Sequence, residues 1–149
     1  MDRGSLYFAF FNEIGIIAQL SRAAFEARLP DGVTLPHFAV LNHLIRVADG
    51  RTPLELARAF QVPKTSMTNT LAGLEARGLV ETRPNPKDKR SKRVWLTEEG
   101  RRFRDEAIDL LVPTMEALAK RFPPAEIGEL VPKLSEIRSY LDASRDDAD

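Results

Sequence analysis

Residues 52–78 read TPLELARAFQVPKTSMTNTLAGLEARG, a stretch in which a strong helix start precedes a short turn. Thr52 offers a hydroxyl at the N-cap, Pro53 suits the first helical position, and Glu55 completes a capping box. These residues predict a short helix over 54–60, which is about two turns long.

A second helix is expected after the turn at 61–63. It spans 64–77 and ends at Gly78, because glycine readily adopts the conformation that terminates a helix. At 100° per residue its apolar side chains share one face, which we expect to be buried: Met67, Leu71 and Leu74. The opposite face carries small and hydrogen-bonding side chains instead of the long Glu and Lys residues of an ordinary solvated helix. Two helices joined by a three-residue turn have helix-turn-helix spacing.

The sequence then changes period. Residues 79–83 and 93–97 alternate in the manner of strands, and the proline-containing segment 84–89 separates them. This pattern predicts a β-hairpin, and Thr97 is placed to cap a helix that follows it. We expect Trp95, on the second strand, to pack rather than to bind a ligand or a base.

Other segments show the three-and-four spacing of amphipathic helices. They predict helices over 5–29, 36–48, 98–122 and 125–143. Pro113 and Pro132 fall inside the last two, which predicts a kink in the former and a kink or short break in the latter. The expected fold class is therefore mainly α-helical with a small β-hairpin, in a single domain over 1–149.

Charge is distributed unevenly along the chain. The 22 Lys and Arg residues balance the 22 Asp and Glu residues, so the net charge is zero. Residues 61–104 nevertheless hold 11 basic and five acidic side chains, and residues 105–149 hold five basic and 11 acidic ones. The segment 83–93 alone has six basic residues and one acid. Such a segment indicates an anionic partner, although a solvated hairpin tip has the same appearance.

Composition excludes several kinds of site. The chain has no cysteine, which excludes disulfides, thiol nucleophiles and Cys-ligated zinc, and its two histidines are too few for a His-rich metal site. We therefore expect no catalytic residues, no metal and no cofactor. No apolar run reaches the roughly 20 residues of a membrane span, and no signal peptide is evident. We expect a cytoplasmic protein that makes no membrane contact.

Two groups of residues have the chemistry of nucleic-acid binding. Near the start of the helix over 64–77, hydroxyl and amide groups can reach phosphates or base edges: Thr65, Ser66, Thr68 and Asn69. At the hairpin tip, we expect the Asp88 carboxylate to hold the Arg90 guanidinium in a fixed fork that enters the minor groove. A chance surface ion pair is the alternative. Neighbouring cations would then lie along phosphates: Lys87, Lys89, Lys92 and Arg93.

Two motifs carry a resemblance to a known family. The pattern D-x-R-x-x-x-V/L-x-L-T-x-x-G is met by Asp88, Arg90, Val94, Leu96, Thr97 and Gly100. The pattern T-x-x-L-x-x-L-E-x-x-G-L-V is met by Thr68, Leu71, Leu74, Glu75, Gly78, Leu79 and Val80. With these motifs and this order of helices, most of the chain resembles a MarR-family transcriptional regulator. Pro63 is a departure, because the family often has Ser or Thr as the cap of the second helix.

The resemblance implies a winged helix-turn-helix lobe over about 34–103. It also implies an intertwined, triangular homodimer formed by the helices 5–29 and 105–143. The implied function is a ligand-responsive repressor that binds an inverted repeat in double-stranded DNA. Helix 64–77 would enter the major groove and the wing 83–93 the minor groove. The residues implied to contact DNA are Lys64, Thr65, Ser66, Thr68, Asn69, Arg83, Lys87, Asp88, Lys89, Arg90, Lys92 and Arg93.

A small aromatic or anionic effector is also implied, in a crevice between the dimer helices and the lobe. The residues that would line the crevice are Phe11, Ile14, His37, Phe38 and Leu41. From the residues alone, packing in the core is the better interpretation of this set, with His37 capping or solvating a helix start. Two other functions stay open. One is a winged helix that docks another protein, which the basic wing argues against, and the other is a small enzyme, for which no catalytic constellation is evident.

Overall fold

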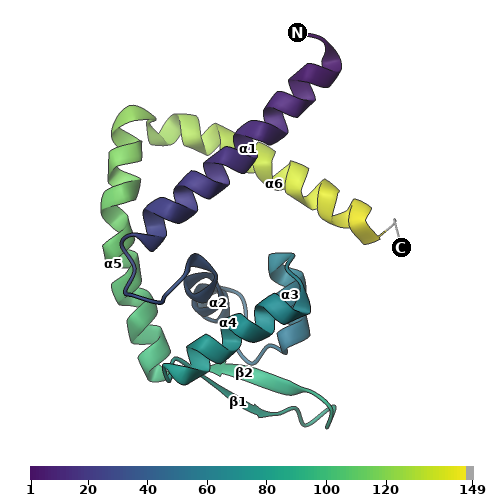
Figure 1. Cartoon of the computed structure of the whole chain (residues 1–149), viewed down its shortest axis with the longest axis vertical. Helices are drawn as coiled ribbons and strands as arrows, with labels where there is room; N and C mark the ends of the chain where they lie inside the picture. The colour runs from purple at the N-terminus through teal and green to yellow at the C-terminus, as the bar shows by residue number, and fades with distance from the viewer. Residues whose placement is uncertain (147–149) are drawn as a thin grey trace. The chain divides into compact units, whose positions relative to one another are not determined.

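A computed structural model describes residues 1–146 of the chain, which form six helices and two strands in this range (Figure 1). The helices are α1 (Arg3–Glu26), α2 (Leu35–Arg46), α3 (Pro53–Phe60), α4 (Lys64–Ala76), α5 (Glu98–Arg121) and α6 (Pro124–Asp146), and the strands are β1 (Val80–Pro84) and β2 (Lys92–Leu96). The fold is thus mainly helical with one small hairpin, as predicted. The chain divides into two compact units, and the boundary falls inside α5 after Leu111.

The helix-turn-helix forms as its local signals predict. The Thr52 hydroxyl accepts a hydrogen bond from the Glu55 backbone N–H at 3.2 Å, and the Glu55 carboxylate accepts from the Thr52 N–H at 3.2 Å. Gln61 has φ 56°, a left-handed conformation that ends α3 and begins the turn. Gly78, with φ 72°, follows the end of α4 in the same conformation.

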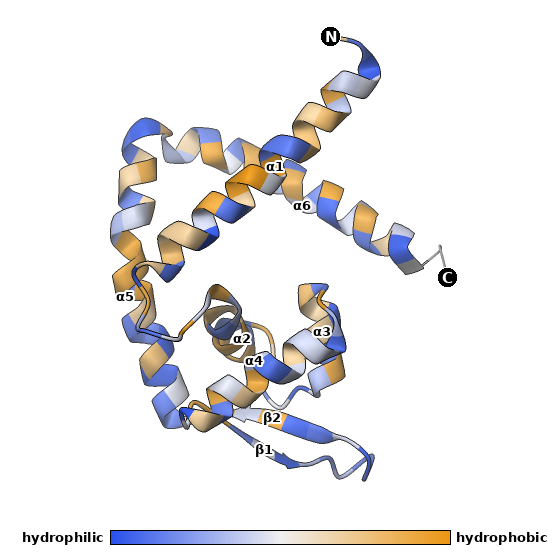
Figure 2. Cartoon of the chain, viewed as in Figure 1, coloured by the Kyte–Doolittle hydropathy of each residue, from blue (hydrophilic) through white to orange (hydrophobic). Residues whose placement is uncertain are grey.

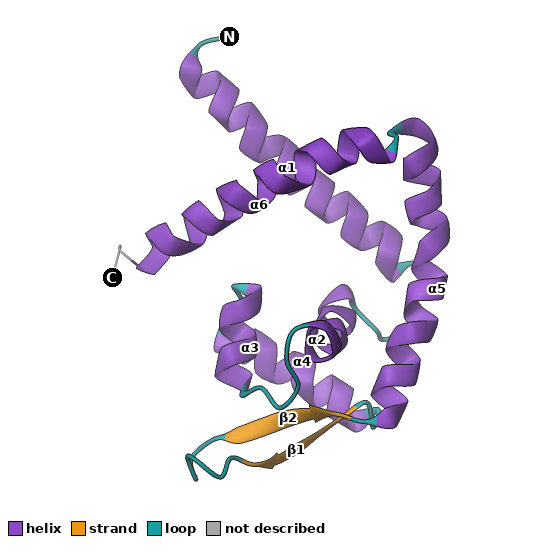
Figure 3. Ribbon diagram, turned by 180° about the vertical axis from the view of Figure 1, so that it is seen from behind, coloured by secondary structure: helices purple, strands orange, loops and turns teal. Residues whose placement is uncertain are grey.

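The two strands pair antiparallel, with register partners running from Val80 opposite Leu96 to Pro84 opposite Lys92 (Figure 3). Each strand is offset by one residue from its predicted range. The offset arises because Leu79 is still bound to α4: its N–H donates to the Leu74 carbonyl at 3.0 Å. At the other end, the Thr97 hydroxyl caps α5 by accepting from the Gly100 N–H at 3.0 Å, which confirms the predicted cap.

One hydrophobic core joins α2, α3 and α4 to the base of the hairpin. Met67, Leu71 and Leu74 are the buried residues of α4, as the helical spacing predicts. A second cluster lies beside it, where Leu29 and Val33 pack with Ala107 and Leu111 of α5. The first cluster holds α4 and the hairpin in a fixed relation within the first compact unit.

The first helix differs from its predicted range at both ends. It begins at Arg3, because the Asp2 carboxylate accepts from the Ser5 N–H at 3.0 Å and so Asp2, not Ser5, is the N-cap. It ends at Glu26 rather than at residue 29: Ala27 and Arg28 form a turn, and Leu29 is buried in the second core cluster.

The two internal prolines lie within continuous helices, Pro113 in α5 and Pro132 in α6. A short break at Pro132, one of the two predicted outcomes, does not occur. Proline removes one backbone donor, but the turns on either side retain theirs and the helix continues. Among the residues described, no helix is long and apolar enough to cross a membrane.

Candidate nucleic-acid interface

The first turns of α4 present the polar residues that the sequence singled out. Met67 points into the core. The five side chains around it are solvent-exposed: Lys64, Thr65, Ser66, Thr68 and Asn69. The Thr68 hydroxyl donates to the Lys64 carbonyl at 2.9 Å, so its proton is used within the helix and its lone pairs remain free to accept. This end of α4 therefore offers hydroxyl and amide groups in a fixed arrangement.

The N-terminus of α4 has no side-chain cap, because Pro63 occupies the capping position. Proline has the φ that a helix start needs but no hydroxyl to accept the amide groups of the first turn. These amides and the helix dipole favour an anionic group at this end of α4.

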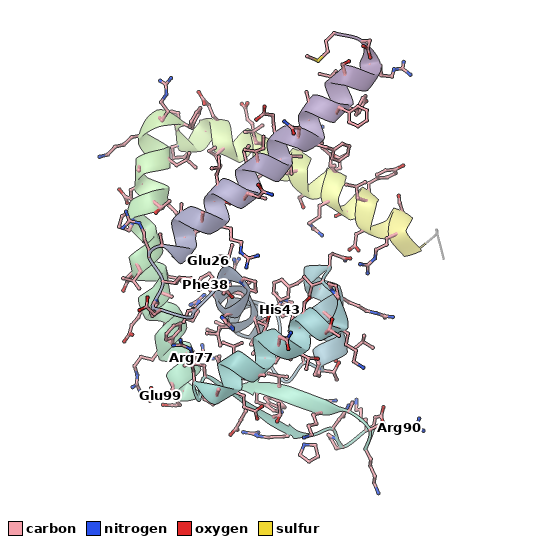
Figure 4. All side chains as sticks on the ribbon, in the orientation of Figure 1. Glu26, Phe38, His43, Arg77, Arg90 and Glu99 are labelled. Carbon is pink, nitrogen blue, oxygen red and sulfur yellow. The ribbon has the colours of Figure 1, made fainter. Side chains whose placement is uncertain are left out.

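The hairpin places its cations at and near its tip. Lys87, Asp88, Lys89 and Arg90 form the exposed turn, and Arg90 projects from its far end (Figure 4). Hydropathy colouring shows hydrophilic residues along the outer half of the hairpin (Figure 2). The tip therefore forms a local cationic surface, separate from the polar face of α4 but in the same compact unit.

Asp88 does not hold the Arg90 guanidinium, so the predicted fork is wrong. Its carboxylate accepts from the Arg90 backbone N–H at 3.0 Å, and it forms no ion pair within the described part of the chain. A separation of two residues suits an Asx turn, in which an aspartate binds a backbone amide just ahead of it. Asp88 therefore shapes the turn and leaves the Arg90 side chain extended.

The two arginines on the strands are held by other side chains. Arg83 forms an ion pair with Glu81, and its guanidinium lies 5.3 Å from the centre of the Trp95 ring. The Arg93 Nε donates to the Asn85 Oδ1 at 3.2 Å. Trp95 also packs on Gly50, where an added Cβ would lie 2.6 Å from the ring. The indole is thus a packing element, as predicted.

Asn85 is a buried residue of the wing tip that the sequence patterns do not single out. Its side chain is buried, and it binds Lys87, Ser91 and Arg93 within the turn. The only sequence signal was its position between two prolines, which marked a break in the strand without indicating what the amide would bind.

Comparison with known proteins identifies this arrangement. A family model described as the MarR family matches residues 31–91. The chain is 34% identical to the transcriptional regulator HosA of Escherichia coli O111:H- over 102 residues. The aligned residues are 67% of this chain and 73% of HosA. The chain belongs to the MarR family.

Solved structures of DNA-binding and transcriptional regulators share the fold. BldR of Sulfolobus solfataricus superposes with a TM-score of 0.84 at 25% identity, over 94% of this chain and 99% of BldR. A cysteine-to-serine variant of E. coli MarR, solved with operator DNA, superposes with a TM-score of 0.78 at 27% identity, over 92% of this chain and 99% of that one. The DNA binding of BpsR from Bordetella bronchiseptica is regulated by 6-hydroxynicotinic acid. Its structure superposes with a TM-score of 0.76 at 23% identity, over 87% of this chain and 98% of BpsR.

These comparisons give the general function of the chain. It is a MarR-family DNA-binding transcriptional regulator with a winged helix-turn-helix fold. The wing is the β1–β2 hairpin with its tip, and α4 is the second helix of the helix-turn-helix.

The structure places the predicted effector residues of this MarR-family chain in different surroundings. Leu41 is 0% exposed inside the first core cluster, and Phe38 packs against the second cluster. Phe38 also lines a cavity of about 480 Å³, whereas Phe11 and Ile14 are exposed on α1. His37 does line a cavity of about 700 Å³, next to the first turns of α4. Leu41 thus packs in the core, as the residues alone suggested, whereas Phe11 and Ile14 do not, and the effector crevice stays a prediction.

His37 instead caps the start of α2, as the alternative interpretation predicted. Its Nδ1 accepts from the Thr34 backbone N–H at 2.9 Å, which favours the neutral ring with its proton on Nε2. Burial lowers the pKa of His37, and the nearby Arg77 charge lowers it further. The ring lies against Gly73 of α4, where a Cβ would sit 2.7 Å from Nε2. His37 therefore belongs to helix packing more than to anion binding.

Glu26 joins the end of α1 to the same helix start. Its carboxylate accepts from the Leu35 N–H at 2.8 Å and from the Arg22 Nε at 2.9 Å. The Leu35 hydrogen bond is the main reason that the pKa of Glu26 is lowered. The first turn of α2 is thus satisfied by groups from both α1 and α2.

Proposed function

We propose that the protein is a sequence-specific repressor that binds an inverted-repeat operator as a homodimer. The observation that carries this proposal is the presence, in one compact unit, of an exposed polar end of α4 and an exposed cationic wing. In this arrangement α4 enters the major groove, where base pairs differ in their donors and acceptors, and the wing follows the adjacent minor groove.

The exposed residues of α4 supply the contacts that read sequence. Asn69 suits an adenine edge, because an amide can both donate and accept, and the hydroxyls of Thr65, Ser66 and Thr68 suit bases or phosphates. Lys64, beside the uncapped helix start, neutralises a phosphate.

The wing supplies charge and a minor-groove contact. Arg90 enters the minor groove, where a narrow width and negative potential favour arginine. The remaining cations lie along the backbone: Arg83, Lys87, Lys89, Lys92 and Arg93. Asp88 acts through the turn that it stabilises.

A second copy of the chain covers the apolar side chains that each compact unit leaves exposed. α1 buries none of its residues, and Phe8 on it is 81% exposed. Exposed apolar side chains also follow α6, and include Leu130, Val131, Leu134 and Leu141. Apolar surface on this scale marks an interface, so we assign dimerisation to the helices at both ends of the chain and treat 1–149 as one functional domain. A two-fold dimer reads half-sites about 10 bp apart, or a multiple of that spacing.

A small aromatic or anionic effector is accommodated by the 700 Å³ cavity. Its wall includes apolar Val40, Phe60 and Met67, together with Arg22 and the base-reading candidates Ser66 and Asn69. A molecule bound there competes directly with DNA for α4, so it lowers DNA affinity. Titration of the DNA complex with benzoate and related aromatic acids tests this, and loss of the effect in Arg22→Ala would place the acid at this cavity.

The test of the proposed function is selection of bound duplexes from a randomised DNA pool at two salt concentrations. We expect an enriched inverted repeat, with weaker binding at the higher salt because several phosphate contacts release counterions. Weak, salt-sensitive binding without enrichment would contradict sequence-specific recognition. Absence of DNA binding at low salt, with capture of a protein partner, would favour the protein-docking alternative.

A further inference from the structure

Asn85 is a buried polar side chain in an exposed and cationic part of the fold. It is 8% exposed, whereas the residues on either side of it, Pro84 and Pro86, are exposed. A polar group is buried stably only when its donors and acceptors are paired. The amide of Asn85 is therefore held in place for its hydrogen bonds.

Those bonds connect both ends of the wing tip. The Asn85 Oδ1 accepts from the Lys87 backbone N–H at 3.1 Å, and its Nδ2 donates to the Ser91 Oγ at 2.9 Å. The backbone of Asn85 adds two more bonds, from its N–H to the Ser91 carbonyl at 3.2 Å and from the Asp88 N–H to its carbonyl at 3.3 Å. One residue thus closes the loop over 85–91.

The same amide oxygen also holds an arginine. It accepts from the Arg93 Nε at 3.2 Å, which leaves the terminal nitrogens of that guanidinium available to another partner. Arg93 needs such a restraint because it lies opposite Arg83 in the strand register, and opposed like charges repel. Glu81 and Trp95 hold Arg83, and Asn85 holds Arg93.

We propose that Asn85 is a positioning residue for the DNA contact of the wing: it fixes the tip loop and aims the Arg93 guanidinium at the DNA backbone without touching DNA itself. An arginine that is already held in its binding conformation loses less side-chain freedom when it binds. This inference rests on the proposed function, in which the wing contacts DNA.

The test is a double-mutant cycle on the full chain, with fluorescence anisotropy on the selected operator. We expect Asn85→Ala to weaken binding about tenfold in the wild-type background. In the Arg93→Ala background the same change should cost less than about threefold, because the group that Asn85 positions is gone. Combined with Lys64→Ala on α4, the two losses should multiply, since Lys64 lies on a different element. Equal losses from Asn85→Ala with and without Arg93 would overturn the inference.

A second variant keeps the test decisive if Asn85→Ala does not fold, which thermal unfolding will show. Arg93→Lys retains the charge but lacks the Nε that binds Asn85, so we expect about a fivefold loss. Arg58→Lys, the same change on the exposed surface of α3, should leave affinity unchanged. Wild-type affinity in Arg93→Lys would overturn the inference. Absence of wild-type binding to any duplex would instead overturn the proposed function, so the two failures are distinguishable.

Discussion

Arg90 shows how a single side chain is prepared by its neighbours. The bond from its backbone N–H to Asp88 holds the turn, and the side chain extends from the tip (Figure 4). We predict that Arg90→Ala weakens operator binding by about 1–3 kcal/mol. It should also reduce, by about one, the steepness with which the logarithm of the binding constant falls against the logarithm of the salt concentration. Arg58→Ala, which removes an equal charge from α3, should have little effect. Unchanged affinity in Arg90→Ala would remove the minor-groove contact from the account.

The surroundings of His37 predict how the stability of the fold changes with pH. Burial, and then Arg77, lower the pKa of His37 in the folded chain, whereas an unfolded histidine titrates near 6.5. Below that pH the unfolded chain binds a proton that the folded chain does not, so the free energy of unfolding should fall as the pH drops from 7.5 to 5.5. Burial lowers the pKa of His43 as well, which adds a second contribution of the same sign.

Urea unfolding at pH 7.5, 6.5 and 5.5 measures this effect. In His37→Asn the amide can still accept from the Thr34 N–H, but it does not titrate. The free energy of unfolding should therefore change less with pH, and the change due to His43 should remain. The lowered pKa of Glu26 acts in a different window, since its stabilisation is lost only below about pH 4.5. An identical slope in the variant would show that His37 does not contribute.

At the scale of elements, α5 is joined to α4 and β1 by a close backbone contact. A Cβ at Gly100 would lie 2.0 Å from the Leu79 carbonyl oxygen, so any side chain forces α5 away from the lobe. We predict that Gly100→Ala lowers the free energy of unfolding by about 1–3 kcal/mol. Gly128→Ala in α6 meets no atom within 4 Å and should be neutral or stabilising by up to about 1 kcal/mol. Equal stability of the two variants in urea would contradict this packing.

Sequence signals predicted the elements whose cause is local. The capping box at Thr52 and the left-handed stop at Gly78 act within a few residues, so α3 and α4 could be located to within one residue. Contacts made across the fold could not be predicted in this way. Leu29 packs with Ala107 and Leu111 of α5, and Asn85 makes bonds to Ser91 and Arg93 that require the hairpin to be closed.

In the candidate site, too, the features with local causes could be predicted and those that depend on the folded structure could not. The polar end of α4 could be read from helical spacing, because Met67 points inward and its neighbours must then point out. The partner of Asp88 depends on loop geometry, which spacing does not encode. The motif containing Asp88 and Arg90 therefore located the wing correctly while suggesting the wrong bond between them.

At the scale of the whole molecule, the exposed apolar side chains of α1 predict that the chain functions as a dimer. Phe8→Glu should shift the protein toward monomer, because an unpaired carboxylate is costly to bury in an apolar interface. Leu54→Glu, at an exposed position on α3, is the matched control and should leave the dimer intact. Sedimentation velocity measures both. A wild-type protein that is monomeric at micromolar concentration would contradict the proposed dimer.

The central claim is that two copies of this chain read two half-sites of one operator. Its most direct test compares the affinity for the selected inverted repeat with that for a duplex in which one half-site is scrambled, at two salt concentrations. The account predicts two chains per repeat, a loss of at least about tenfold on scrambling, and weaker binding to both duplexes at the higher salt. Equal affinity for the two duplexes would contradict it.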